Sequence, residues 1–231
     1  MMVNNETGAL FPIREMIAAV RRNAPGALFH CDAVQAAGKL PIHAGRLDVD
    51  MMTLSGHKLH GPKGVGALYI KKGVRLLPRA YGGGQERGLR PGTEAVPLIT
   101  AFGAAAAALP SPAEQTRHYD ALRSRLLEGL QGRGDVVFHL PAASVPYILN
   151  LSVPGIRSET MLHFLAERGV YVSSGSACSK GKKSPVLTAW QLPPGEIDSA
   201  LRISFSRYNT EEDVDRLIAG LIAGSESLIR A

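Results

Sequence analysis

Short apolar segments alternate with amphipathic ones over the first hundred residues of the chain. Residues 27–31, 49–54 and 65–70 are nearly continuous runs of apolar side chains, as in strands that are buried on both faces. Pro12 is expected at the first position of a helix whose buried face consists of Ile13, Met16, Ile17 and Val20. Strands that alternate with helices predict an α/β domain with a mainly parallel sheet.

The pattern changes near residue 110. An alanine-rich helix is predicted over residues 94–109, and Ser111 and Glu114 form a capping box for the next helix. The apolar face of that next helix consists of Tyr119, Leu122, Leu126 and Leu130. We therefore divide the chain into a larger domain over residues 1–109 and a small C-terminal domain over residues 110–231.

The predicted C-terminal domain mixes strands and helices. Short apolar runs predict strands at residues 136–140, 147–153, 170–173 and 201–205. Two helices are expected to begin at the caps Ser158 and Thr210, and a short helix is expected around Trp190. This order predicts an α+β fold for the small domain.

The composition is that of an ordinary globular protein. Of the 231 residues, 45% are hydrophobic and 20% are charged. The sequence contains neither a run of about 18 apolar residues nor a signal-peptide pattern. We therefore expect a cytoplasmic protein that does not associate with a membrane. The two cysteines make no disulfide framework, and because no Cys/His cluster has the spacing of metal ligands, no metal is expected.

The net charge of +6 comes from 26 basic and 20 acidic residues. Most of the positive charges are dispersed, which argues against a nucleic-acid surface. The one dense group, Lys180, Lys182 and Lys183, has no interleaved aromatic residues and is explained equally well by a solvated loop. We expect no direct nucleic-acid partner.

Polar residues follow two of the predicted strands. Asp32 ends the first apolar run, and residues 55–58 end the second. Because ligands of such sheets bind beyond the carboxyl ends of the strands, these residues are expected to line one pocket. A lysine such as Lys58 forms a Schiff base when desolvation lowers its pKa, and an adjacent aspartate keeps the nitrogen of a pyridoxal ring protonated. The alternatives are a solvated lysine and an N-cap at Asp32 for a helix that begins at Ala33.

Three other features leave two interpretations open. Cys178 lies among Ser, Gly and Ala beside several lysines, where it is either a nucleophile with thiolate character or a small side chain in a surface turn, whereas Cys31 is expected in the core. The glycine-rich residues 82–93 either cradle a phosphate through backbone amides and Thr93 or form a flexible surface loop. Arg202 is either a carboxylate-binding fork or an edge-strand charge.

Six short motifs occur in a fixed order along the chain, and their combination is specific to one family. They are NNETG at 4–8, HCDAVQ at 30–35, SGHKLHGPKGVGALY at 55–69, GGGQERGLRPGT at 82–93, SSGSACS at 173–179 and LRISFSRYNTEEDVD at 201–215. Together they resemble the cysteine desulfurases of the NifS and IscS type, in the class V aminotransferase group, along essentially the whole chain. The resemblance implies part of the large domain of PLP-dependent transferase fold type I, followed by the small domain. It also implies removal of sulfur from L-cysteine with pyridoxal 5'-phosphate (PLP), which gives L-alanine and an enzyme persulfide.

The resemblance also implies roles for individual residues. Lys58 is similar to the Schiff-base lysine, Asp32 to the partner of the pyridinium nitrogen and Cys178 to the nucleophile that carries the persulfide. Arg202 matches the arginine that binds the substrate carboxylate. Gln35 and Asn5 match residues that contact the phenolic oxygen of PLP, and Asn5 also lies near the substrate carboxylate in the family. Ser55 and His57 match ligands of the PLP phosphate. Thr93 matches a phosphate ligand that the other subunit of a dimer supplies.

Partners follow from the same resemblance. It implies a homodimer and a sulfur acceptor such as an iron–sulfur scaffold or a tRNA-thiolation enzyme. The stretch after Cys178, SKGKKSPVLTAW, is shorter and more basic than in the IscS subgroup. A basic loop of this kind is expected to prefer an acidic acceptor surface.

The sequence departs from the family at its beginning. Family members carry about 150 further residues, the size of one ordinary domain, before the position of Val3. Those residues supply a ring-stacking histidine and a phosphate-binding glycine–threonine turn, and neither occurs here. Two alternatives therefore stay open: a fragment that holds PLP poorly and acts as a dimerising or interaction module, and a selenocysteine lyase.

Overall fold

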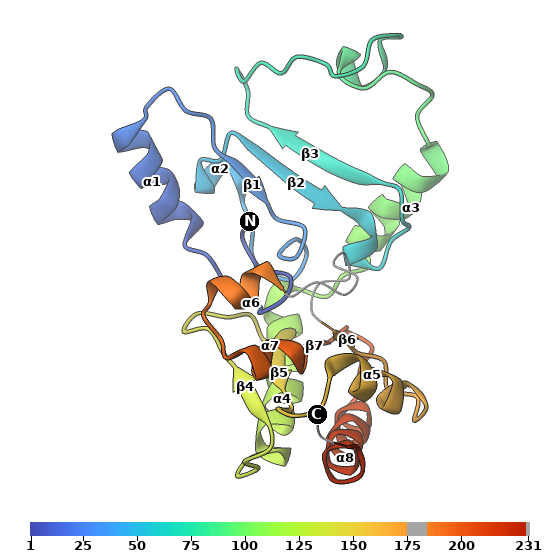
Figure 1. Ribbon diagram of the computed structural model, residues 1–231. Coiled ribbons are helices and arrows are strands. Elements are labelled where there is room, and N and C mark those ends of the chain that lie inside the picture. The colour runs from blue at the N-terminus through green and yellow to red at the C-terminus, as the bar shows by residue number, and fades with distance from the viewer. Residues whose placement is uncertain (175–183, 230–231) are drawn as a thin grey trace. The chain divides into compact units, whose positions relative to one another are not determined.

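The computed structural model describes residues 1–174 and 184–229. The chain divides into two compact units (Figure 1). The first unit contains Met1–Met2 and Pro12–Pro112, and the second contains Val3–Phe11 and Ala113–Ala231. No helix in the described ranges is by itself long and apolar enough to cross a membrane.

The first unit is built on a three-stranded sheet in the order β1-β2-β3. Its strands are β1 (His30–Asp32), β2 (Met51–Ser55) and β3 (Gly66–Ile70). β1 and β2 are parallel, whereas β2 and β3 are antiparallel, so this α/β sheet is mixed. The short connection between β2 and β3 explains why they are antiparallel. Two consecutive parallel strands need a crossover connection of about a dozen residues or more.

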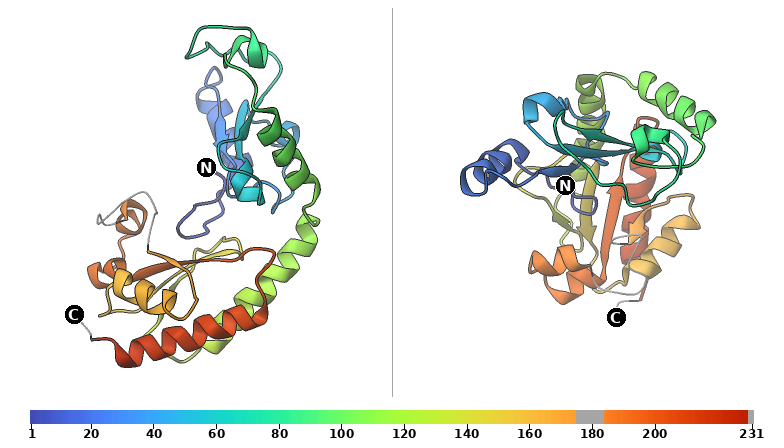
Figure 2. Two further views of the ribbon diagram at one scale, coloured as in Figure 1. Left: turned by 90° about the vertical axis from the view of Figure 1, so that its right-hand side faces the viewer. Right: turned by 90° about the horizontal axis from the view of Figure 1, so that it is seen from above.

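Helices accompany this sheet, and α1 and α3 lie on opposite sides of its strands (Figure 2). They are α1 (Ile13–Asn23), α2 (Ala44–Leu47), α3 (Val96–Ala107) and the short 3₁₀ helices η1 (Gly56–Leu59) and η2 (Gln85–Gly88).

The predicted face of α1 is only partly buried. Ile13 and Ile17 are buried, but Met16 is 42% exposed, and Pro12 is the N-cap residue instead of the first helical residue. Apolar residues on β3 and α3 also stay exposed, among them Leu68, Val96 and Ile99. The first unit therefore has both a buried core and an uncovered apolar surface.

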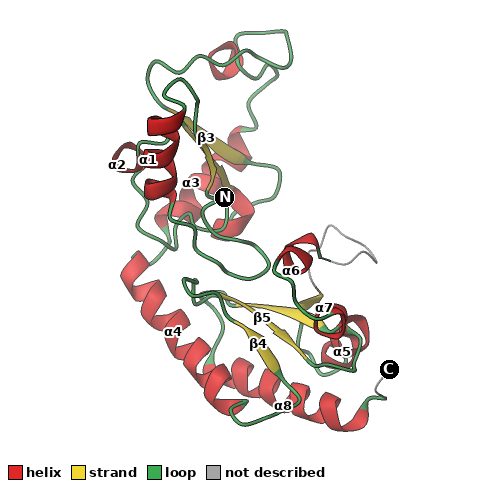
Figure 3. Ribbon diagram, turned by 60° about the vertical axis from the view of Figure 1, so that its left-hand side comes forward, coloured by secondary structure: helices red, strands yellow, loops and turns green. Residues whose placement is uncertain are grey.

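The second unit contains a four-stranded antiparallel sheet in the order β4-β5-β7-β6. Its strands are β4 (Val137–His139), β5 (Ile148–Ser152), β6 (Ser173–Ser174) and β7 (Ala200–Ser204), and its helices are α4 (Pro112–Gly129), α5 (Ser158–Ala166), α6 (Pro185–Ala189), α7 (Pro194–Asp198) and α8 (Glu211–Ser227). The long helices α4 and α8 cover one face of the sheet (Figure 3). All five residues of β5 are buried, so the core of this unit lies between β5 and the helices.

The N-cap residues of the helices in the second unit agree only in part with those predicted from the sequence. Thr210 caps α8 as expected, in a capping box with Asp213. Ser158 does not cap α5, because it is the first helical residue and Arg157 is the N-cap. Ser184 is a cap that the sequence analysis missed: its hydroxyl accepts a hydrogen bond from the backbone N–H of Leu187 at the start of α6.

The segment Val3–Phe11 belongs to the second unit, although the sequence division placed it with residues 12–109. It is held there by backbone hydrogen bonds, from Val145 N–H to the Gly8 carbonyl and from Leu10 N–H to the Ala143 carbonyl. Gly8 has a φ of +72°, and a Cβ there would lie 2.3 Å from the Ile148 carbonyl oxygen. The segment is therefore tied to strand β5 by close backbone contact.

Candidate functional site

Polar residues gather at one edge of the sheet in the first unit. In the parallel pair β1–β2, Asp32 lies opposite Thr53, and β2 ends two residues later at Ser55. Helix η1 follows directly and carries His57 and Lys58. The carboxyl ends of two neighbouring parallel strands thus lie together, which is where α/β sheets bind ligands.

Glycine sets the tight backbone path into η1. The Gly56 N–H donates to the Val65 carbonyl, and the Gly61 N–H donates to the Gly56 carbonyl, both at 3.0 Å. A Cβ on Gly56 would lie 2.9 Å from a methyl group of Val65 and 3.1 Å from its carbonyl oxygen. The turn that carries Lys58 therefore needs a residue without a side chain at its first position.

Ser55 and His57 form a polar pair beside Lys58. The Ser55 hydroxyl shares a hydrogen bond of 2.9 Å with Nδ1 of His57. Burial lowers the pKa of His57, and the positive charges of Lys58 and Lys63 lower it further. Both effects favour the uncharged imidazole.

Asp32 is the last residue of β1, and Gln35 lies on the connection that follows. Oδ1 of the Asp32 side chain accepts a hydrogen bond of 2.9 Å from the Val34 N–H. The alternative that Asp32 caps a helix beginning at Ala33 is wrong, because this connection is a series of hydrogen-bonded turns. The Asp32 side chain remains exposed, and Gln35 is half-buried.

Lys39 is a neighbour of Lys58 that the sequence analysis missed. Its ammonium group donates a hydrogen bond of 3.1 Å to the backbone carbonyl of Lys58. Burial lowers the pKa of Lys39 to about 8, and the charge of Lys58 contributes. A lysine 19 residues upstream, in a turn of small residues, gives no sequence signal of this contact.

The second unit holds Arg202 in the middle of a sheet. Strand β7 lies between β5 and β6, so the edge-strand interpretation of Arg202 is wrong. Its guanidinium donates to the Asn5 carbonyl and to the Ser173 hydroxyl, each at 3.2 Å. Burial lowers the pKa of Arg202, while the nearby Glu6 opposes that shift. Within the described residues its buried Nε has no hydrogen-bond partner.

Asn5 and Arg202 are thus brought together, through the backbone of Asn5. The neighbouring Glu6 is buried and accepts a hydrogen bond of 2.5 Å from the Ser184 hydroxyl. Ser184 is the first described residue after Cys178, which itself lies outside the described residues together with Lys180, Lys182 and Lys183.

The remaining predicted positions differ in surroundings. Thr93 is exposed on the segment between η2 and α3. Cys31 is fully buried, as expected of a core residue, and its burial raises the pKa of its thiol. In the described part of the chain, no group of three His, Cys, Asp or Glu side chains has the arrangement of a metal site.

The sequence profile of the Aminotransferase class-V family matches residues 1–217. The chain therefore belongs to this family. Several of its curated relatives are named cysteine desulfurase. One from Gluconacetobacter diazotrophicus is 46% identical over 236 residues, which cover 96% of this chain and 57% of that protein. The cysteine desulfurase NifS of Azotobacter vinelandii is 42% identical, covering 94% of this chain and 55% of that protein.

Solved structures agree with this family assignment. A NifS-like protein superposes with a TM-score of 0.87 at 39% identity and covers 97% of this chain and 60% of its own. A NifS-like protein from Rickettsia africae gives a TM-score of 0.88 at 30% identity, covering 98% of this chain and 61% of its own. The resemblance and the fold expected from the sequence are thus confirmed. The chain spans little more than half the length of the relatives it matches.

Proposed function

We propose that this chain is the part of a PLP-dependent cysteine desulfurase that carries the Schiff-base lysine, the substrate-binding arginine and the persulfide cysteine. The single observation that carries the proposal is the edge of the first sheet, where Asp32 at the end of β1 lies opposite Thr53, just before Ser55, His57 and Lys58. The names and lengths of the relatives support it.

The residues at this edge fit PLP chemically. Lys58 supplies the amine, and Asp32 supplies a carboxylate on the neighbouring strand end. The hydroxyl of Ser55 is hydrogen-bonded to the imidazole of His57, and the charges of Lys58 and Lys63 act on that imidazole. Hydrogen-bond donors in positive surroundings suit a phosphate dianion. When bound, PLP supplies an electron-withdrawing ring that takes up the electrons released at the substrate carbon.

Three side chains of the protein bind the substrate, transfer a proton and attack the substrate sulfur. Arg202, held by Asn5 and Ser173, binds the substrate carboxylate through its guanidinium. The amine of Lys58 moves a proton to and from the substrate carbon. The Cys178 thiolate attacks the substrate sulfur, so that an S–S bond forms and the carbon–sulfur bond breaks. The electron pair of that bond remains on carbon, which takes up a proton in forming alanine.

We also propose a homodimer, a cytoplasmic location and a protein acceptor for the persulfide sulfur. The exposed apolar residues of β3 and α3 support a partner surface. The three lysines that follow Cys178 in the sequence support an acceptor of acidic surface.

Trapping with borohydride tests the cofactor assignment. The chain is mixed with PLP, reduced with borohydride and digested, and the pyridoxyl group is located by peptide mass. We expect the label on Lys58, and we expect Lys58→Arg to lose it while the control Lys63→Arg keeps it. A chain that takes up no label, or that labels Lys63 and Lys58 alike, would support the alternative of a PLP-poor fragment.

A further inference from the structure

The turn after β1 packs closely against η1 in the first unit. Gly38 has a φ of +70°, and a Cβ there would lie 2.9 Å from a methyl group of Leu59. The next residue, Lys39, reaches η1 with its ammonium group and donates to the carbonyl of Lys58 at 3.1 Å. The contact is therefore built into the packing of two backbone segments.

A second cation beside a lysine changes the chemistry of that lysine. The charge of Lys58 acts on the half-buried Lys39 and helps to lower the pKa of Lys39 to about 8. Coulomb repulsion is mutual, so the Lys39 charge acts on Lys58 as strongly. A neighbouring cation is one of the ways in which proteins activate a lysine as a nucleophile.

The other charged groups identified near Lys58 differ in sign and in exposure. On η1 itself the neighbour is His57, whose uncharged form is favoured by its lowered pKa, and the loop after η1 adds the Lys63 charge. Helix α3, which packs against η1, contains no titratable side chain. The nearest strand end contributes the carboxylate of Asp32, which is exposed to solvent and is therefore screened.

We propose that Lys39 is a positioning residue for Lys58. Its charge favours the uncharged, nucleophilic form of the Lys58 amine, and its hydrogen bond fixes the backbone of η1 at Lys58. The use of that amine for PLP rests on the proposed function, whereas the coupling between the two lysines does not.

The test measures the titration of Lys58 directly. The lysines are dimethylated with ¹³C-formaldehyde, and the methyl resonance of Lys58 is identified by its loss in Lys58→Arg. In Lys39→Met and Lys39→Gln, we expect the pKa of Lys58 to rise enough to lower its uncharged fraction at neutral pH about threefold or more. Lys39→Arg keeps the charge and should leave the titration near that of the wild type.

Lys71→Met is the matched control, because Lys71 is paired with Asp48 elsewhere in the first unit. It should leave the Lys58 titration unchanged. The inference is overturned if Lys39→Gln folds and Lys58 titrates as in the wild type, or if Lys71→Met shifts Lys58 equally. Borohydride trapping of PLP on the same variants separates the two proposals: a shifted titration without any trapped PLP in the wild type leaves the coupling intact and removes the proposed function.

Discussion

At the scale of single residues, the position of Lys58 depends on the glycine at position 56, the first residue of η1. A Cβ added at Gly56 would lie 2.9 Å from a methyl group of Val65 and 3.1 Å from its carbonyl oxygen. Gly56→Ala should lower the free energy of unfolding by about 1–3 kcal/mol, because the added methyl group must displace backbone. Urea unfolding measures this value.

The control for Gly56→Ala is Gly26→Ala, which has no atom within 4 Å of its Cβ position. That substitution should change the free energy of unfolding by less than about 1 kcal/mol. Equal effects of the two substitutions would contradict the packing argument at Gly56.

Residue types at strand ends were predictable, but their contacts were not. Asp32 and Lys58 follow apolar runs, and the rule that α/β sheets bind ligands at the carboxyl ends of their strands predicts both residues at one edge of the sheet. Lys39 and Glu6 were missed, because each acts through a tertiary contact, with the Lys58 carbonyl and the Ser184 hydroxyl respectively. Such contacts depend on chain folding between distant residues and leave no local pattern.

At the scale of elements, periodicity located most helices and strands but not the sheet direction. The buried face of α4 contains Tyr119, Leu122 and Leu126, as its spacing predicted. The direction of β3 depends on a connection without a crossover helix, which an apolar run alone does not reveal. Likewise, the placement of Val3–Phe11 with the second unit depends on pairing with residues 143–145.

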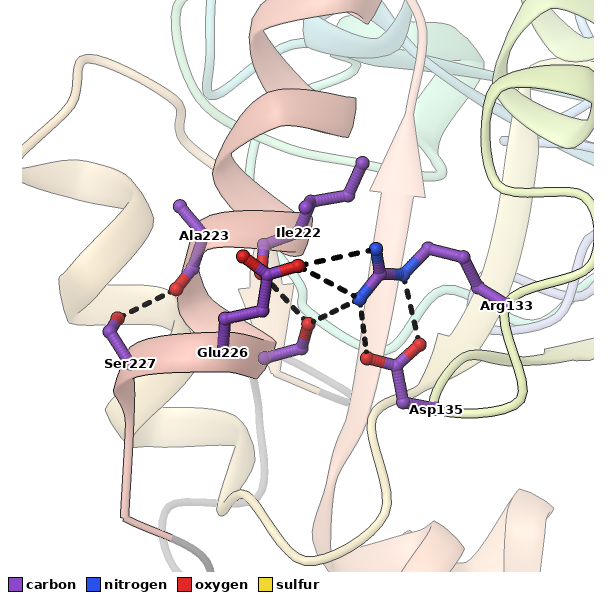
Figure 4. Close-up of polar contacts among 7 residues, drawn as sticks. Arg133, Asp135, Ile222, Ala223, Glu226 and Ser227 are labelled. Carbon is purple, nitrogen blue, oxygen red and sulfur yellow. Dashed lines mark hydrogen bonds and ion pairs between the residues drawn. The ribbon is translucent and has the colours of Figure 1, made fainter.

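An ion pair joins the turn after α4 to α8 in the second unit (Figure 4). Arg133 donates two hydrogen bonds to the Asp135 carboxylate, at 2.8 and 2.9 Å, and also contacts Ser225 and Glu226. The hydrogen bond from Arg133 lowers the pKa of Asp135 from 3.8 to about 2, against a smaller opposing effect of burial.

This shift predicts a pH dependence of stability. Because the folded state lowers the pKa of Asp135, its contribution is complete above about pH 4 and is lost as the pH falls through about 2. Asp135→Asn should cost about 2 kcal/mol at pH 6, and its difference from the wild type should fall to a small fraction of that value at pH 2. Denaturant unfolding at a series of pH values measures the difference.

Asp120→Asn, an exposed position on α4, is the control and should change the free energy of unfolding by less than about 0.5 kcal/mol at either pH. A cost of Asp135→Asn that stays constant from pH 6 to pH 2 would show that Arg133 does not lower the pKa of this carboxyl.

At the scale of the whole molecule, the proposed catalytic groups are divided between the two units. The first contains Lys58, Asp32 and the Ser55–His57 pair, and the second contains Arg202 and Asn5. The chain aligns over 94–96% of its length with relatives of which it covers 55–57%. The family profile and the relatives place the chain in the Aminotransferase class-V family.

One measurement tests the proposed desulfurase chemistry most directly: a single turnover of the PLP-loaded chain with L-cysteine, followed by amino-acid analysis and peptide mass. We predict that alanine is released and that the peptide with Cys178 gains one sulfur atom. Cys178→Ser should abolish that gain, and Cys31→Ser, at a buried position, serves as the control that retains it. A chain that binds PLP at Lys58 but releases no alanine from L-cysteine, or that gains no sulfur at Cys178, would contradict the account.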